Sequence, residues 1–393
     1  MAACDEHGLE SAADETRAPC DGDAHRGGYY NNTALQPGNA LIPPHTRASF
    51  LVIRRDNIGD LVCTTPLFEA LRQRFPAARI YALTNSYNLP VLRSNPFIDE
   101  AFAYTKAKHR EPGTSLWSVY AHRLGLIWHL RRLRIDYAVI GSCGFVPRAL
   151  RFARLLRPRH IVSHVPVGRS IRGVDMPVPH DWEPPRHEVE DVYSVLAPFG
   201  ITGAPPLPRV VPDAQERVRA EAALEARGVR APIGVHISAR KPTSRWPLER
   251  VVELMRRLHV ERNAAFMLFW SPGDSRNPLH PGDDDKARAV LEQLRGVPVV
   301  AHPTERLEAL IAGLSVCERV ICSDGGAMHI AAALGKPILC FFGNSGATRW
   351  RPWGVPHVLL QPPSLNAADI SVEEAYAAYE RLLNSSRPNR TPA

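Results

Sequence analysis

From Ser49 onward, short apolar runs alternate with stretches of helical periodicity. The first run, residues 50–53, is followed by a loop at 54–59 and then by Leu67, Leu71 and Phe75 at four-residue spacing, as on one face of a helix. The same alternation returns after residue 232. Strands separated by helices favour parallel sheets covered by helices on both faces. The sequence therefore predicts an α/β protein.

The alternation can be followed to the end of the chain. Strands are predicted at 50–53, 80–83, 138–140, 160–162, 233–236, 265–269, 297–300, 319–322 and 337–341, and helices at 115–134, 146–157, 187–197, 214–227, 247–260, 284–295, 305–314, 327–334 and 371–384. Ligands usually bind at the carboxyl ends of such strands.

Length and composition predict two domains. The chain has 393 residues and is 45% hydrophobic, and single cores stop growing near about 250–300 residues. A Pro-rich linker at 203–208 divides the alternating region. We predict four regions: a disordered extension at 1–45, Rossmann-like domains at 46–205 and 206–370, and a final helix and tail at 371–393.

The charge is unevenly distributed. The chain carries a net charge of +8, but residues 1–45 hold seven acidic residues and two arginines, which leaves +13 on residues 46–393. This excess indicates an acidic partner: a phosphorylated small molecule, an anionic membrane surface or nucleic acid. No reading module or interleaved aromatic residues support nucleic acid.

Cysteines and apolar runs indicate the compartment. The seven cysteines are scattered and lie mostly in apolar surroundings, which predicts free or buried thiols in a reducing environment. No run approaches the roughly 18 apolar residues of a membrane-spanning helix, and no signal sequence is evident. We expect a cytoplasmic protein.

The first segment with chemical potential follows the strand at 50–53. Gly59 permits a close backbone approach or a positive φ, and Asp60 lies where the helix is expected to begin. Asp60 could point into the cleft and accept a proton from a hydroxyl. The alternative is that Asp60 only caps the helix.

The second segment, residues 236–247, follows a buried strand. It is dense in hydroxyls and cations, which suit a diphosphate through charge-assisted hydrogen bonds. The candidate ligands are Ser238, Arg240, Lys241, Ser244 and Arg245. A solvated basic loop is the alternative.

The third segment, residues 323–337, has adjacent glycines at a helix start. Backbone N–H groups and the helix dipole at Gly325 and Gly326 favour phosphate oxygens. His329 by itself is more typical of a hydrogen-bonded core histidine. The acidic run at 283–285 is expected to start a helix, so we predict no metal site.

In this order and spacing, the segments resemble glycosyltransferase family 9, whose known members are heptosyltransferases of lipopolysaccharide synthesis. The resemblance covers about residues 48–385 and includes Phe342-Gly343 and the stretch from Arg349 to Gly354. It implies a GT-B fold, in which two Rossmann-like domains face each other across a cleft. It also implies an inverting transfer from a nucleotide-diphosphate sugar, most simply ADP-heptose, with no cofactor.

The resemblance also implies roles for single residues. Asp60 matches the general base, Asp324 the acid that holds the donor sugar, and His329 a histidine close to the nucleotide. Gly325 and Gly326 match the diphosphate contacts. On the acceptor side the matching residues are Gly59, Thr64 and Thr65.

The sequence departs from the family at two positions. Ser244 stands where the family usually has a lysine that stabilises the leaving diphosphate, and Gly325 stands where threonine is common. Arg240, Lys241 or Arg245 must replace that lysine, and Arg245, next to the vacant position, is the first candidate.

Three hypotheses follow. The first is heptose transfer to a lipopolysaccharide-core or related glycan acceptor. The second is the same fold with another nucleotide sugar, or with a capsule or protein acceptor. The third is a non-catalytic nucleotide-binding protein.

An arginine-rich stretch indicates a possible membrane contact. Arginines recur every third residue from Arg148 to Arg157, and Arg131, Arg132 and Arg134 lie nearby. This predicts either a solvated surface helix or peripheral contact with an anionic inner membrane and its glycolipid.

Overall fold

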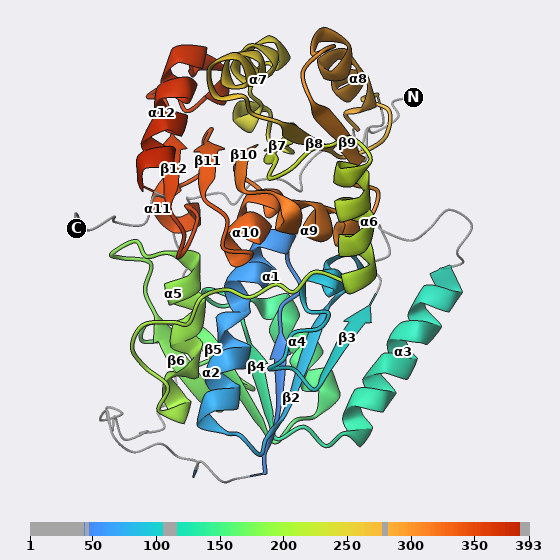
Figure 1. The fold of residues 1–393 in the computed structure, drawn as a ribbon. Helices are drawn as coiled ribbons and strands as arrows, with labels where there is room; N and C mark the ends of the chain where they lie inside the picture. Colours follow the sequence, from blue (N-terminus) through green and yellow to red (C-terminus); the bar gives the residue numbers. More distant parts are fainter. Residues whose placement is uncertain (1–42, 44–46, 105–115, 277–281, 386–393) are drawn as a thin grey trace, which may run out of the picture. The chain divides into compact units, whose positions relative to one another are not determined.

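The structure is a computed structural model that describes residue 43 and residues 47–104, 116–276 and 282–385. Residues 40–393 belong to one compact unit, and Figure 1 shows its helices and strands. Apart from Pro43, the predicted extension at 1–45 lies outside the described residues.

The first sheet has six parallel strands in the order β3-β2-β1-β4-β5-β6. The strands are β1 (Ser49–Ile53), β2 (Arg79–Asn85), β3 (Glu100–Tyr104), β4 (Tyr137–Ile140), β5 (His160–Pro166) and β6 (Met176–His180). The accompanying helices are α1 (Ile58–Thr64), α2 (Pro66–Arg74), η1 (Ser86–Val91), α3 (Leu116–Arg132), α4 (Pro147–Leu156), α5 (Glu188–Tyr193) and η3 (Ser194–Phe199).

The second sheet also has six parallel strands, in the order β12-β11-β10-β7-β8-β9. The strands are β7 (Ile233–His236), β8 (Phe266–Trp270), β9 (Val299–Pro303), β10 (Arg319–Ser323), β11 (Ile338–Phe341) and β12 (His357–Leu360). Its helices are α6 (Ala214–Glu225), η4 (Pro242–Ser244), α7 (Leu248–Arg262), α8 (Asp284–Gln293), α9 (Leu307–Val316), α10 (Gly326–Ala333), α11 (Ala347–Trp350), η5 (Ala367–Asp369) and α12 (Val372–Ser385).

Alternate residues of the central strands pack into different apolar clusters. In β1, Phe50 and Val52 join one cluster, whereas Leu51 and Ile53 join another. Successive side chains of a strand point to opposite faces, so both faces of the first sheet are buried. The cluster around Phe50 and Val52 continues into the second sheet through Met267. The predicted α/β fold with parallel sheets is confirmed.

The predicted elements differ from the structure mainly at the sheet edges. The three strands that the sequence did not predict, β3, β6 and β12, are all edge strands. β6 contains Pro177 and Pro179, and proline is confined to sheet edges because it cannot donate a ladder hydrogen bond. The domain boundaries at 205/206 and 370/371 stay predictions.

The helix expected after residue 59 is present, but its bounds differ from the prediction. It begins at Ile58 as α1, and a second helix, α2, begins at Pro66. Proline suits the first turn of a helix, where no partner for its missing N–H is required. The helix predicted at 187–197 likewise divides into α5 and the 3-10 helix η3.

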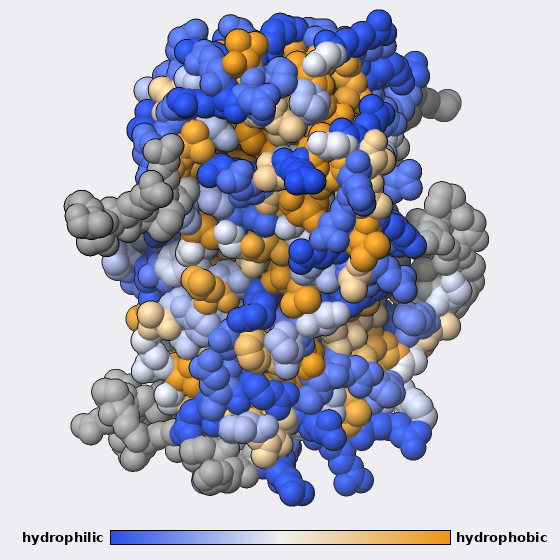
Figure 2. Space-filling view, viewed as in Figure 1, coloured by the Kyte–Doolittle hydropathy of each residue, from blue (hydrophilic) through white to orange (hydrophobic). Residues whose placement is uncertain are grey.

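Among the described residues, no helix has the length and apolar character needed to span a membrane. On the face drawn in Figure 2, hydrophobic residues lie in several groups between hydrophilic ones. The five cysteines that the structure describes are free, and all except Cys143 are buried. This agrees with the expectation of free or buried thiols.

Candidate active site

Asp60 lies in the first turn of α1 and forms a capping box with Asn57. Asn57 is the N-cap, and its backbone N–H and side-chain Nδ2 donate to Asp60 Oδ2 at 2.9 and 3.0 Å. Asp60 therefore takes part in capping the helix, which was the alternative to a catalytic role. It does so as the third helical residue, whereas Asn57 is the N-cap residue. The carboxylate thus helps to fix the turn that follows β1.

The other oxygen of Asp60 pairs with a buried cation. Arg54 follows β1, is 4% exposed, and donates from an Nη to Asp60 Oδ1 at 2.7 Å. Burial would raise the pKa of Asp60, but Arg54 and the Asn57 donors lower it below its usual value. Asp60 is therefore an ionised carboxylate that can accept a proton, and its side chain keeps some exposure, 12%.

Arg54 is the centre of a larger ion-pair network. It contacts Glu188 of α5 at 2.9 Å and Asp56 at 3.0 Å, and it donates to the Gly141 carbonyl at 2.7 Å. Burial alone would lower the pKa of Arg54, but Asp60, Glu188 and Asp56 together raise it. Arg54 is consequently a permanent cation whose charge is balanced by carboxylates.

Glu188 extends this network to the second half of the chain. Its other oxygen accepts from Arg349 of α11 at 2.5 Å, and Arg349 also contacts Asp191 at 3.3 Å. Sequence reasoning missed both partners. Arg349 was noticed only as part of the last family segment, and no sequence signal marks Glu188, because its partners are 134 and 161 residues away.

Gly59 and Gly326 allow α1 and α10 to cross closely. A Cβ atom on Gly59 would lie 2.5 Å from the His329 ring, and one on Gly326 would lie 3.1 Å from Ile58 Cβ. Of the two explanations for Gly59, close approach is the one that the structure supports. Gly326 therefore has a packing role in addition to its predicted N–H role.

Thr64 and Thr65 serve the helix rather than an open surface. Thr64 is 0% and Thr65 1% exposed. Their hydroxyls donate to the carbonyls of Asp60 at 2.8 Å and Val62 at 2.7 Å, and Thr65 Oγ1 also accepts from the Arg209 N–H. Both hydroxyls are buried in this structure, and the acceptor-side role of the two threonines stays a prediction.

His329 has the contacts of a core residue. It is 4% exposed, its Nδ1 lies 3.7 Å from Cys63 Sγ, and its ring stands edge-on to Trp350 at 5.8 Å. Burial lowers its pKa, so the imidazole is neutral. The packing interpretation of His329 fits these contacts better than a place against the nucleotide.

The second segment contacts the first directly and is linked to the third through Ser345. Arg240 donates to Asn57 Oδ1 at 3.2 Å, and Asn57 in turn holds Asp60. Lys241 Nζ donates to Ser345 Oγ at 2.9 Å, and Ser345 donates to Asp324 Oδ2 at 2.5 Å. The cations of this loop thus lie between the two candidate carboxylates.

Arg245 is oriented differently from what its position in the sequence indicated. Its Nε donates to the Ala239 carbonyl at 3.0 Å, and it lines a pocket with Trp246 and Lys286. Ser244, at the position of the family lysine, is fully buried and its hydroxyl makes no hydrogen bond. Lys241, rather than Arg245, is linked to Asp324 through Ser345, and which cation replaces the family lysine stays a prediction.

Asp324 follows β10, and Gly325 is the N-cap of α10. The first N–H groups of a helix have no partner within it, so this end can receive an anion.

Ser238 turns its hydroxyl to the neighbouring strand end, where it accepts from the Ser271 N–H at 2.9 Å. The predicted helix start at 283–285 is confirmed, since α8 begins at Asp284.

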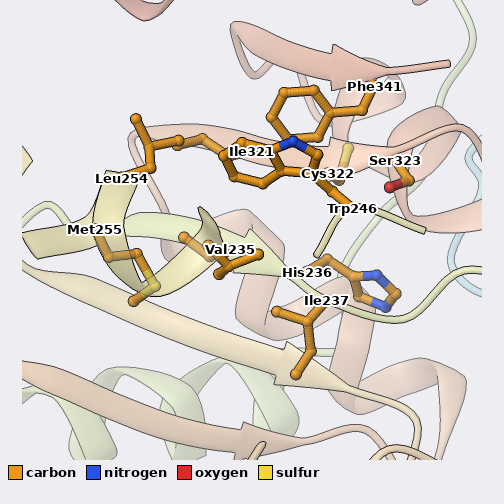
Figure 3. A pocket seen from close by; sticks show the side chains of 11 residues that line it. Val235, His236, Ile237, Trp246, Leu254, Met255, Ile321, Cys322, Ser323 and Phe341 are labelled. Atoms are coloured by element: carbon orange, nitrogen blue, oxygen red, sulfur yellow. The ribbon is translucent and has the colours of Figure 1, made fainter. Parts of the chain in front are cut away.

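A pocket opens beside these residues at the ends of β7, β10 and β11 (Figure 3). Its lining consists of Val235, His236, Ile237, Trp246, Val251, Leu254, Met255, Ile321, Cys322, Ser323 and Phe341. The rings of Trp246 and Phe341 stack at 4.5 Å. Burial lowers the pKa of His236 to about 4, so this histidine is neutral near pH 7. The lining suits an uncharged, flat or apolar group.

Metal ligands do not gather around the site. Over residue 43 and residues 47–104, 116–276 and 282–385, no three His, Cys, Asp or Glu side chains form a group that could hold a metal ion.

Comparison with known proteins identifies the family. The model of glycosyltransferase family 9 (heptosyltransferase) matches residues 169–377. Lipopolysaccharide heptosyltransferase 3 of Escherichia coli K12 is 25% identical over 354 residues, covering 84% of this chain and 97% of that protein.

Solved structures show the same fold. The glycosyl transferase family 9 protein of Veillonella parvula superposes with a TM-score of 0.73 at 20% identity, covering 88% of this chain and 99% of that one. The ADP-heptose lps heptosyltransferase II of E. coli has a TM-score of 0.66 at 19% identity, covering 86% and 99%. The chain therefore belongs to glycosyltransferase family 9, and it is a glycosyltransferase with the α/β GT-B-type fold.

Proposed function

We propose that this glycosyltransferase transfers heptose from ADP-heptose to a lipopolysaccharide-core or related glycan acceptor, with inversion at the anomeric carbon. The names of its relatives support this choice, since one is a lipopolysaccharide heptosyltransferase and another is described with ADP-heptose. The free thiols and the absence of a spanning helix among the described residues agree with action in the cytoplasm.

One observation carries the proposal: three segments far apart in sequence meet around Asp60. Arg240 reaches Asn57 across 183 positions. Lys241 reaches Ser345, which holds Asp324. Gly59 lies against His329. A proton acceptor, exposed cations and a helix N-terminus are thereby linked to one another.

Asp60 is the proposed general base. Its carboxylate takes the proton of the acceptor hydroxyl as that oxygen bonds to the anomeric carbon of the donor. The bond from this carbon to the diphosphate oxygen breaks with its electron pair, which leaves the nucleotide diphosphate. Because Arg54 and Asn57 lower the pKa of Asp60, this group stays ionised below its usual range.

Lys241 is the proposed replacement for the family lysine. Negative charge develops on the leaving diphosphate, and a cation and the N-terminus of α10 stabilise such charge. Lys241 is exposed and reaches the third segment through Ser345. Asp324 would hold the donor sugar, and no cofactor beyond the nucleotide sugar is part of the proposal.

A donor screen tests the function. The full chain is mixed with ADP-heptose or with other nucleotide sugars, and binding is followed by calorimetry. Release of the nucleotide diphosphate is then measured with and without a heptose-deficient lipopolysaccharide core. We expect binding and acceptor-dependent ADP release with ADP-heptose. Turnover of another nucleotide sugar would move the proposal to that donor, and neither binding nor turnover of any would refute it.

A further inference from the structure

The first turn of α5 holds the segment at 349–353, which carries part of the family resemblance but takes no part in the proposed reaction. His187, the N-cap of α5, accepts from the Val189 N–H through Nδ1, so its Nε2 carries the proton and donates to the Arg351 carbonyl at 2.8 Å. Burial lowers the pKa of His187 to about 4, so the ring is neutral near pH 7. This ring also lies 4.5 Å from that of Trp353. The segment is therefore fixed to α5.

Glu188, the next residue of α5, is shared by two cations. It is 1% exposed, and its Oε2 accepts from Arg349 at 2.5 Å and its Oε1 from Arg54 Nη2 at 2.9 Å. The same Nη2 atom of Arg54 donates to Asp60 Oδ1 at 2.7 Å. One nitrogen thus holds both the carboxylate of Glu188 and that of the proposed base. A displacement of Glu188 therefore acts on the hydrogen bond that fixes Asp60.

Removal of Arg349 would change how Arg54 is shared. Among the residues that the structure describes, Arg54 and Arg349 are the cations paired with Glu188. Without Arg349, the Glu188 carboxylate would draw Arg54 closer, because an uncompensated charge in the interior is costly. The Arg54 Nη2 atom would then move away from Asp60. We propose that Arg349 is a positioning residue, which keeps Arg54 on Asp60 by neutralising Glu188. This inference rests on the proposed function, since it takes Asp60 as the general base.

α11 also approaches α10, the helix whose N-terminus is proposed to receive the diphosphate. Trp350, the neighbour of Arg349 in α11, stands edge-on to the His329 ring of α10 at 5.8 Å. A Cβ atom on Gly59, the residue before Asp60, would lie 2.5 Å from that ring. Adjacent residues of one short helix thus reach α10 and Glu188. Arg349 thereby ties the position of the base to the half of the chain that is proposed to bind the donor.

Two other roles for Arg349 make different predictions. A direct ligand contact would need a free guanidinium, yet its Nη atoms are paired with Glu188 at 2.5 Å and Asp191 at 3.3 Å, and its side chain is 24% exposed. Its Cζ atom also lies 4.6 Å from the centre of the Trp182 ring. A purely structural ion pair would stabilise the fold without affecting turnover of the folded enzyme. Kinetics therefore separates both roles from positioning.

Turnover of the full chain with ADP-heptose and a heptose-deficient lipopolysaccharide core tests the proposal. Arg349→Met should lower turnover about tenfold, because a slightly misplaced catalytic group loses rate, while the dissociation constant for ADP stays within about twofold. Arg349→Lys keeps a charge beside Glu188 and should recover most of the turnover. A lysine variant as slow as the methionine variant, or weaker ADP binding with unchanged turnover, would overturn the proposal.

The double variant Asp60→Asn/Arg349→Met identifies the group through which Arg349 acts. Two changes that act through one group are not additive. Once Asp60 no longer accepts a proton, loss of Arg349 should slow turnover by less than about twofold further. A further loss of about tenfold would show that Arg349 acts elsewhere, and would overturn this inference alone. Full turnover in Asp60→Asn would refute the proposed base as well, so the two failures are distinguishable.

Arg351→Met is the matched control, since Arg351 lies on the same segment and its guanidinium donates to the Thr348 carbonyl at 2.6 Å. It should leave turnover unchanged, and circular dichroism checks that every variant is folded. A crystal structure of Arg349→Met gives a readout without turnover, in which Arg54 Nη2 should lie closer to Glu188 and farther from Asp60. An Arg54 side chain in its original place, or an equal loss of turnover in Arg351→Met, would overturn the proposal.

Discussion

The loops that follow β1 and β7 hold their charged residues in opposite ways. After β1, Arg54 is buried and contacts three carboxylates, and both oxygens of Asp60 are occupied. After β7, Arg240, Lys241 and Arg245 are exposed. Within the part of the chain that the structure describes, each of these side chains donates one hydrogen bond. The first loop is a rigid, prearranged charge network, whereas the second can rearrange around a ligand.

This difference separates two kinds of cost. A change in the buried network should first reduce stability, because removing one partner leaves a charge uncompensated in the interior. A change in the exposed loop should reduce donor affinity and leave stability nearly unaltered, because exposed ion pairs contribute little.

Glu188→Ala should have the largest effect on stability. Glu188 is 1% exposed and links Arg54 to Arg349, so its removal should lower the free energy of unfolding by about 3–5 kcal/mol. Urea denaturation of the full chain measures this. Arg288→Ala breaks an exposed pair with Asp285 and should cost less than about 1 kcal/mol. Equal losses in the two variants would remove the distinction between the buried network and exposed ion pairs.

Asp60→Asn should cut turnover about a hundredfold or more while donor affinity stays nearly intact, because a general base is lost. Steady-state rates and calorimetry with ADP-heptose measure the two quantities. Asp56→Asn is the matched control, since Asp56 also pairs with Arg54, but its side chain is 42% exposed and it does not hold Asn57. Unchanged turnover in Asp60→Asn would refute its role as base.

Lys241→Met should weaken donor binding about tenfold, as expected for one charge-assisted hydrogen bond to a phosphate. Arg245→Met, a change of equal charge in the same loop, should have a smaller effect, because the Arg245 Nε donates to the Ala239 carbonyl, whereas Lys241 is linked to Asp324 through Ser345. Calorimetric titration with ADP separates the two variants. A larger loss in Arg245→Met would restore the choice that sequence position alone indicated.

Local patterns were enough to predict most of the fold. Buried strands such as β1 and β8 are continuous apolar runs, and helix starts carry proline or acidic residues, as at Pro147 and Asp284. The edge strand β6 escaped because it lacks such a run: its sequence is Met-Pro-Val-Pro-His. Pairing along the sheet edge, not local composition, makes these residues a strand.

The candidate site was less accessible from sequence. Asp60 could be found because it follows a buried strand in a family segment. Glu188 could not, since nothing nearby in sequence indicates that it meets Arg54 and Arg349. Arg245 was favoured because it adjoins Ser244, yet the short 3-10 helix at Pro242–Ser244 turns the chain between Lys241 and Arg245. Lys241 and Arg245 therefore have different hydrogen-bond partners, Ser345 and the Ala239 carbonyl, which the backbone path decides.

Ser244→Ala should have the smallest effect, and its sign is informative. The Ser244 hydroxyl is fully buried and makes no hydrogen bond, so methyl in its place removes an unsatisfied polar group. We expect unfolding stability to be unchanged or higher by up to about 1 kcal/mol, with donor affinity unaltered, as measured by urea denaturation and calorimetry. Ser238→Ala is the control, since its hydroxyl accepts from the Ser271 N–H and its loss should destabilise. A fall in donor affinity for Ser244→Ala would mean that the loop after β7 opens to bring Ser244 to the diphosphate. This loop would then be more adaptable than its exposed cations indicate.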